Sequence, residues 1–86
     1  MRPVTSLRNL GPKSAMMLAE AGIRTVEELR EIGAVKAYVR VKQIRNRGVS
    51  LNLLYSIAAG LDNRGWQELS EEEKAKLASE AKALQR

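Results

Sequence analysis

The fold is decided by residues 7–23, which read LRNLGPKSAMMLAEAGI. Gly11 and Pro12 interrupt any helix that begins before them. Pro12 suits the first turn of a new helix, because its missing N–H needs no partner there. Gly22 is a typical residue for ending a helix. We therefore expect a helical hairpin, with a short first helix capped by Thr5 or Ser6 and a second helix over residues 12–21.

Capping boxes predict the starts of two further helices. Thr25 with Glu28 opens a helix that Gly33 ends, and Ser70 with Glu73 opens the last helix of the chain. Ser50 is expected to cap a helix over residues 51–61. That helix is apolar almost all round, which predicts that it is the buried centre of the fold or of an oligomer.

Residues 34–46 fit two structures. Valine and alanine alternate strictly with lysine, tyrosine and arginine, which is a strand pattern. The same residues also give a helix with Ala34, Ala37, Tyr38, Val41 and Ile44 on one face. No second convincing strand exists to pair with the first, and a lone strand leaves its backbone groups unsatisfied. We therefore predict a helix.

Length and composition support one all-α domain. The chain has 86 residues, which suits a single compact domain over residues 1–86. Leu, Ala and Met, which are good helix formers, dominate the apolar residues, and there is no Phe. Together with the helix signals, this predicts an all-α fold: a compact domain of five or six helices that opens with the N-terminal hairpin.

Two absent residue types restrict the chemistry. The chain has no Cys and no His, so it has no thiolate, no disulfide and no histidine base or ligand. No phosphate-loop or dinucleotide motif occurs. We therefore expect no enzyme, no cofactor and no bound metal. No membrane-spanning stretch and no signal peptide is visible, so we expect a cytoplasmic protein with no membrane partner.

Positive charge is concentrated in the first part of the chain. Residues 1–50 carry ten basic and four acidic side chains, a net +6, and residues 51–86 carry a net −1. The densest basic run covers residues 36–47 and contains no acid. Its candidate contact residues are Lys36, Arg40, Arg45 and Arg47, and it also contains Lys42. A one-sided basic excess indicates a polyanion such as nucleic acid, although a solvated helix face explains the same pattern.

The hairpin resembles the helix-hairpin-helix motif of DNA repair and recombination proteins. Leu10, Gly11, Lys13, Ala15 and Leu18 fall where that motif has them. The resemblance implies a phosphate held by the N–H groups of Gly11, Lys13 and Ser14, with charge from Lys13 and from nearby Arg8. Contacts of this kind reach the nucleic-acid backbone and do not recognise sequence. Asn9 stands where the motif usually has glycine, and asparagine tolerates a left-handed backbone.

The order of motifs along the chain is similar to a larger unit. The runs are LRNLGPKSA at 7–15, TVEEL at 25–29, SLNLLY at 50–55, and Trp66 before LSEEEK at 69–74. Together they resemble the C-terminal domain of the TfoX (Sxy-like) competence regulators over residues 5–82. The resemblance implies a compact bacterial helical domain that regulates competence for DNA transformation. In full-length members a separate N-terminal α/β domain precedes it.

Two functions follow from these observations. The first is a regulatory interaction module that docks onto a transcription factor, onto another protein or onto a second copy as a homodimer, with Tyr38, Tyr55 and Trp66 as contact residues. The alternative is direct DNA binding, independent of sequence, through the hairpin turn and the basic helix face. For the aromatic residues, simple core packing explains the same pattern.

Overall fold

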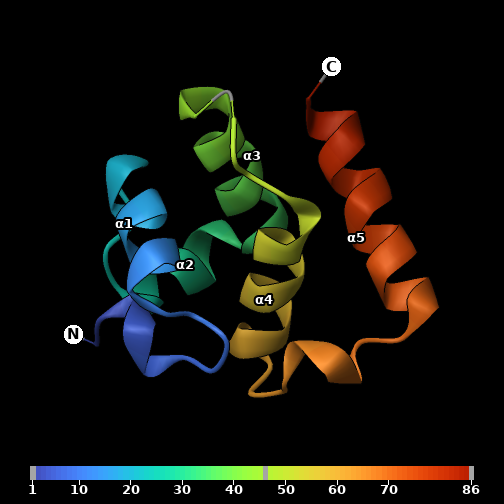
Figure 1. Cartoon of the computed structure of the whole chain (residues 1–86), viewed down its shortest axis with the longest axis horizontal. Helices are drawn as coiled ribbons and strands as arrows, with labels where there is room; N and C mark the ends of the chain where they lie inside the picture. The colour runs from blue at the N-terminus through green and yellow to red at the C-terminus, as the bar shows by residue number, and fades with distance from the viewer. Residues whose placement is uncertain (1, 46, 86) are drawn as a thin grey trace.

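A computed structural model describes residues 2–45 and 47–85. Its described part is all-helical, with five α-helices and two short 3-10 helices (Figure 1). In chain order these are η1 (Val4–Ser6), α1 (Pro12–Glu20), α2 (Val26–Ile32), α3 (Ala34–Ile44), α4 (Leu51–Leu61), η2 (Trp66–Glu68) and α5 (Glu71–Leu84). The all-α prediction is confirmed, and the ambiguous segment is helical. Its predicted last residue, 46, lies outside the described residues.

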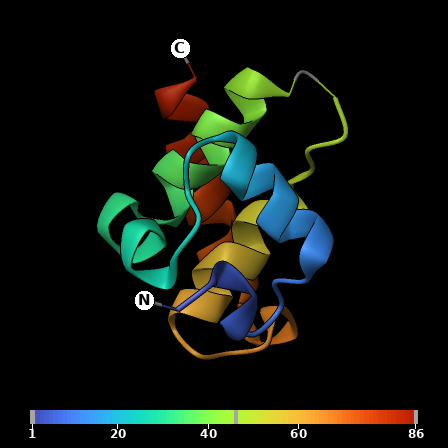
Figure 2. The ribbon, with the colours of Figure 1, turned by 90° about the vertical axis from the view of Figure 1, so that its left-hand side faces the viewer.

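Helix α3 is the centre of the arrangement, because it packs against α1, α2, α4 and α5. Helices α1 and α5 stand on opposite sides of it (Figure 1), and the side view shows α5 crossing behind α3 (Figure 2). The largest side chains without solvent exposure come from four helices and one loop, and they are Leu18, Ile23, Val26, Leu29, Tyr38, Val41, Leu54 and Ile57. The predicted central helix α4 supplies two of them.

The N-terminal hairpin has one α-helical arm. Its first arm, η1, is only three residues long, and Pro3 occupies the N-cap position, so Thr5 and Ser6 lie inside the element that they were expected to cap. Val4 is buried, and an antiparallel bridge joins Pro3 to Thr25. Pairing with the segment before α2 therefore anchors this arm.

The predicted capping boxes are both present. The Thr25 hydroxyl accepts from the Glu28 N–H at 3.1 Å and the Ser70 hydroxyl accepts from the Glu73 N–H at 3.0 Å, while each glutamate accepts from its cap residue in return. Ser50 occupies the N-cap of α4 as expected, but its side chain accepts no capping hydrogen bond. Gly22 and Gly33 follow their helices with φ of +83° and +89°, as their predicted roles require.

Helix α3 and helix α5 each differ from the pattern of their sequence near the C-terminal end. Ile44 was placed on the buried face of α3 but is 53% exposed, because it is the last residue of that helix. Leu77, Ala81 and Leu84 are spaced as an apolar stripe on α5, but Leu84 is 45% exposed. Glu72 and Lys76 of α5 have i,i+4 spacing, whereas the observed ion pair joins Lys74 to Glu71 at 2.8 Å. In the described part of the chain, no helix is long and apolar enough to span a membrane.

Candidate functional site

The turn before α1 is clamped to the segment that follows α4. Asn9 has a φ of +74°, and its side chain bonds to backbone groups of α4 and of the segment after it. Its Nδ2 donates to the carbonyl of Arg64 at 2.9 Å and, more weakly, to that of Ser56 at 3.4 Å. Its Oδ1 accepts from the N–H of Trp66 at 3.2 Å. Asn9 thus fixes the hairpin turn and the start of η2 relative to each other.

Close backbone packing supports this clamp. A Cβ atom added to Gly60 would lie 2.6 Å from the carbonyl oxygen of Arg8, so only glycine lets α4 approach the turn this closely. The Arg8 side chain continues along the same contact. Its Nη1 donates to the carbonyl of Asn63 at 3.1 Å, and its Nη2 lies 3.6 Å from a carboxylate oxygen of Glu68.

Arg64 connects the clamp to α5. Its Nη2 donates to Glu73 at 2.7 Å, and its Nε lies 2.9 Å from a carboxylate oxygen of Asp62. The hydrogen bonds from Arg64 and from the Ser70 N–H lower the pKa of Glu73 from 4.5 to about 2. The same pairing raises the pKa of Arg64. The charges here stabilise the connection between α4 and α5, since each group already has a partner.

A small hollow separates the N-termini of α1 and α4, and we call it the α1/α4 hollow. It has a volume of about 200 Å³, and its polar lining residues are Lys13, Ser14, Ser50, Asn52 and Ser56. No side chain caps either helix here, and neither helix has an acidic residue in its first turn. The N–H groups of Gly11, Lys13 and Ser14 donate no hydrogen bond within the described chain. The arrangement is electropositive, and it leaves backbone donors free.

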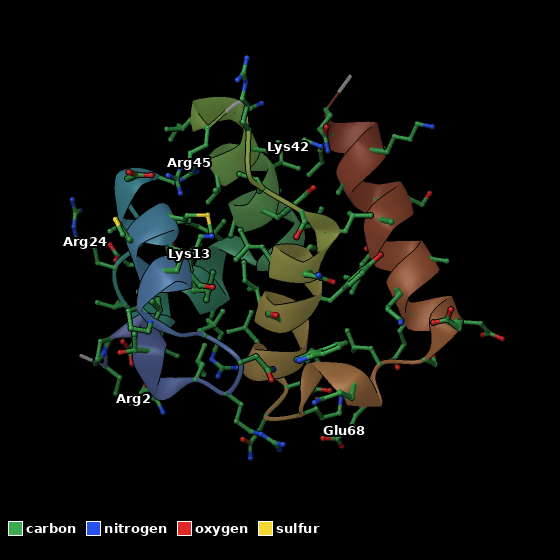
Figure 3. All side chains as sticks on the ribbon, in the orientation of Figure 1. Arg2, Lys13, Arg24, Lys42, Arg45 and Glu68 are labelled. Atoms are coloured by element: carbon green, nitrogen blue, oxygen red, sulfur yellow. The ribbon has the colours of Figure 1, made fainter. Side chains whose placement is uncertain are left out.

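The predicted basic residues do not gather around this hollow. Arg8 pairs with Glu68, which lies at the opposite end of the molecule from Lys42 and Arg45 (Figure 3). Arg45, at the end of α3, pairs with Glu20 of α1 at 3.3 Å. Two of the candidate phosphate contacts are therefore neutralised by acidic neighbours.

The other basic residues of α3 face different surroundings. Lys36 lines a second hollow with Glu80 and Leu84 of α5, which we call the α3/α5 hollow, and this hollow shares no lining residue with the first. Arg40 is exposed on α3, and Arg47 is exposed next to Gly48, a residue that lines the α1/α4 hollow. The structure thus brings together Gly11, Lys13 and Ser14 and places Lys36 elsewhere.

The three aromatic candidates differ sharply in exposure. Tyr38 is 1% exposed and belongs to the core, so it offers no surface for a partner. Tyr55 is half-buried against the core, and the Lys74 ammonium lies 6.0 Å from its ring centre. Trp66 is 46% exposed on η2. Of the three, Trp66 presents the most surface to solvent.

Sequence reasoning missed the residues that position this surface. Asn9 was recognised only as a residue that tolerates a left-handed backbone, and no local pattern reveals its bonds to residues more than 45 positions away. Arg64 and Gly60 were likewise assigned no role. Asn52 and Ser56 are the polar residues on the otherwise apolar helix α4, and they line the α1/α4 hollow together with Lys13.

Comparison with known proteins identifies close relatives. The family model of the TfoX C-terminal domain matches residues 1–81. The curated DNA transformation protein TfoX of Haemophilus influenzae is 38% identical over 71 residues, which are 83% of this chain and 32% of that protein. The chain thus spans about a third of that relative's length.

Two solved structures share the fold, and both are Listeria monocytogenes proteins whose function is unknown or uncharacterised. The first, in a tetragonal crystal form, is 28% identical with a TM-score of 0.83, over 93% of this chain and 98% of that one. The second, in a triclinic form, is 27% identical with a TM-score of 0.84, over 95% of this chain and 92% of that one.

Proposed function

The chain belongs to the TfoX C-terminal domain family, and we propose that it is a non-enzymatic regulatory module of bacterial DNA transformation that works by binding another protein. The name of the Haemophilus influenzae relative supports a role in DNA transformation. The exposed Trp66 on η2 is the observation that supports binding through protein contacts. We assign the protein to the cytoplasm, where a regulator of this kind meets transcription factors.

Trp66 has the properties of an interface anchor. Tryptophan and arginine are over-represented among the residues that dominate binding energies. The exposed pair of Arg8 with Glu68 joins the turn before α1 to η2, the element that carries Trp66. The hydrogen bond between the Trp66 N–H and Asn9 already fixes the backbone at this position. A surface fixed in advance loses less conformational entropy on binding, so more of the contact energy remains as affinity.

The ionisable groups of the chain support the non-enzymatic part of this proposal. With no His and no Cys, a reaction would need carboxylates or lysines with strongly altered pKa values in a cleft. The carboxyl group with the largest lowering, Glu73, completes a capping box and an ion pair. Helix capping and pairing account for it fully.

The experiment that tests this function is a transformation assay. A host lacking the gene would be complemented with wild type, Trp66→Ala or the matched neighbour Gln67→Ala. We expect Trp66→Ala to lower transformation frequency about tenfold or more, the effect of losing one hot spot, while thermal stability stays near wild type. Gln67→Ala should complement fully. Full complementation by Trp66→Ala would refute a contact centred on this residue.

Direct DNA binding is the second candidate, and the α1/α4 hollow favours it. Lys13 and the free N–H groups of two helix starts suit a phosphate oxygen, and such binding would be independent of sequence and would weaken steeply with salt. Labelled duplex DNA would be titrated at low and raised salt with wild type, Lys13→Glu and the exposed control Lys82→Glu. Binding that survives Lys13→Glu, or no binding at low salt, contradicts this candidate.

A further inference from the structure

The α3/α5 hollow is a second surface feature, and Trp66 is not among the residues that line it. Its volume is about 490 Å³, and it lies between the junction of α2 with α3 and the last turns of α5. Ile32 and Val35 line one wall, and Ala83 and Leu84 line the other. Leu84 remains 45% exposed, so this hollow keeps apolar surface in contact with water.

The backbone keeps this hollow open. Gly33, which lines it, has a φ of +89°, and a Cβ atom added there would meet no atom within 4 Å. The left-handed backbone requires glycine at this corner, and glycine has no side chain to cover the neighbouring apolar groups. The hollow therefore follows from the way α2 turns into α3.

The charges at the hollow are self-complementary. Lys36 stands on the α3 wall and Glu80 on the α5 wall. Within residues 2–45 and 47–85, neither of them forms an ion pair. The hollow therefore carries one positive and one negative side chain beside its apolar surface. A second copy of the same surface can offer each of them a partner of opposite charge. A polyanion would instead need an excess of positive charge here.

We propose that the α3/α5 hollow is the interface between two copies of this chain, related by a two-fold axis through the hollow. This inference goes beyond the proposed binding through Trp66, because it uses a different surface of the molecule. A two-fold interface joins the same patch from both protomers. Rotation about the axis brings Lys36 of one protomer opposite the partner's Glu80, twice per dimer. Leu84 and Val35 of each protomer then cover the other's apolar wall.

The dimer is expected to be weak. A standard interface buries about 800 Å² on each partner, and this chain exposes 5395 Å² in total, so such a contact takes roughly 15% of its surface. The hollow alone provides less area than this, so the contact must also extend over its rim. Association should therefore rise over concentrations from about 10 μM to about 1 mM, as for transient complexes.

The test is charge reversal followed by sedimentation velocity. Wild type should shift from monomer towards dimer as its concentration rises. Lys36→Glu and Glu80→Lys should each stay monomeric alone, because each places two like-charged pairs in the interface. An equimolar mixture of the two variants should dimerise again, since both pairs are then of opposite charge. Matched reversals outside the hollow, Lys42→Glu and Glu72→Lys, should behave as wild type, and circular dichroism checks that all variants fold.

A crosslink provides an independent readout. The chain contains no Cys, so a single Ala83→Cys substitution gives a thiol in the hollow with no background. Oxidation should produce a disulfide-linked dimer, whereas Ala75→Cys, which does not line the hollow, should remain monomeric. Ala83→Cys that crosslinks no faster than Ala75→Cys would count against the two-fold arrangement.

Other outcomes separate this inference from the proposed function. A wild type that stays monomeric at about 1 mM overturns the dimer. Dimerisation unaffected by either charge reversal also overturns it, since the contact would then use another face. If the protein is monomeric and Leu84→Glu still abolishes transformation, the hollow binds a different protein and the second copy is excluded. Loss of transformation with Trp66→Ala would leave the proposed function standing in each case.

Discussion

Asn9 and Asn63 have the same backbone conformation in two neighbouring turns, but the turns depend on them differently. Both residues have positive φ, +74° and +55°. The side chain of Asn9 makes hydrogen bonds to the backbone of Ser56, Arg64 and Trp66, whereas Asn63 contributes its carbonyl, which accepts from Arg8. The comparison shows that one turn needs asparagine for its side chain and the other needs only a residue that tolerates the left-handed region.

Replacing each asparagine by alanine should give the largest difference. Asn9→Ala loses the side-chain hydrogen bonds and strains the backbone, so we expect a loss of about 2–4 kcal/mol in the free energy of unfolding. Asn63→Ala keeps every hydrogen bond of the native turn and should cost about 1 kcal/mol. Urea denaturation measures both values. Equal losses would show that the Asn9 side chain contributes nothing beyond its backbone conformation.

Gly60 tests whether the Asn9 turn depends on close packing as well. Gly60→Ala places a Cβ 2.6 Å from the carbonyl oxygen of Arg8, and we expect a net cost of about 1–3 kcal/mol. The better helix propensity of alanine opposes this cost by up to about 1 kcal/mol. Thermal unfolding followed by circular dichroism measures the result. A variant more stable than wild type would mean that the turn shifts away from α4 without penalty.

Glycine at each turn isolates the side-chain contribution. Asn9→Gly keeps the positive φ and loses the hydrogen bonds, so it should cost about 1–2 kcal/mol, whereas Asn63→Gly should stay within about 0.5 kcal/mol of wild type. Trp66 is the only tryptophan, so its fluorescence reports on η2 directly. Its emission anisotropy should fall in Asn9→Gly and stay unchanged in Asn63→Gly. Unchanged anisotropy in both would show that Asn9 does not hold η2.

Acid should weaken the pair of Arg64 with Glu73, which lies next to the Asn63 turn. We expect this to be the smallest of the effects on stability. Glu73 has a pKa of about 2 in the folded chain against 4.5 ordinarily, chiefly because of its hydrogen bonds with Arg64. A lowered pKa contributes stability that is fully present above pH 4.5 and is lost as the pH falls towards 2. Glu73→Gln should therefore flatten the decline in stability over this interval, and Glu72→Gln should not. Identical pH profiles for the two variants would remove the Arg64–Glu73 pair as the cause.

The sequence predicted local structure well because helix boundaries depend on neighbouring residues. Capping boxes, Pro12 and the glycines after α1 and α2 placed these boundaries to within about a residue. Ser50 was placed correctly at a helix start, although its hydroxyl does not cap. The strand alternative for α3 was rejected because no partner strand exists, an argument about the whole chain rather than about that segment.

The candidate site was predicted less completely, because it depends on contacts between distant residues. Gly11, Lys13 and Ser14 are close in sequence, and they do form one helix start. Arg8 was grouped with them because it is near them in the sequence, and Lys36 and Arg45 because of their charge. The fold pairs Arg8 and Arg45 with acids and places Lys36 at another hollow. Periodicity placed Tyr38 on the apolar face of its helix, where the structure buries it, and no sequence pattern distinguishes that burial from a binding role.

The hydrogen bond between Asn9 and Arg64 has a consequence for the lifetime of the folded chain. It joins residues 55 positions apart, so forming it costs the entropy of closing a long loop. We expect a contact of this range to form late and to be largely absent from the folding transition state. Its loss therefore accelerates unfolding and leaves the folding rate nearly unchanged. Asn9 thus acts on how long each molecule stays folded, and so on its resistance to proteases that capture open chains.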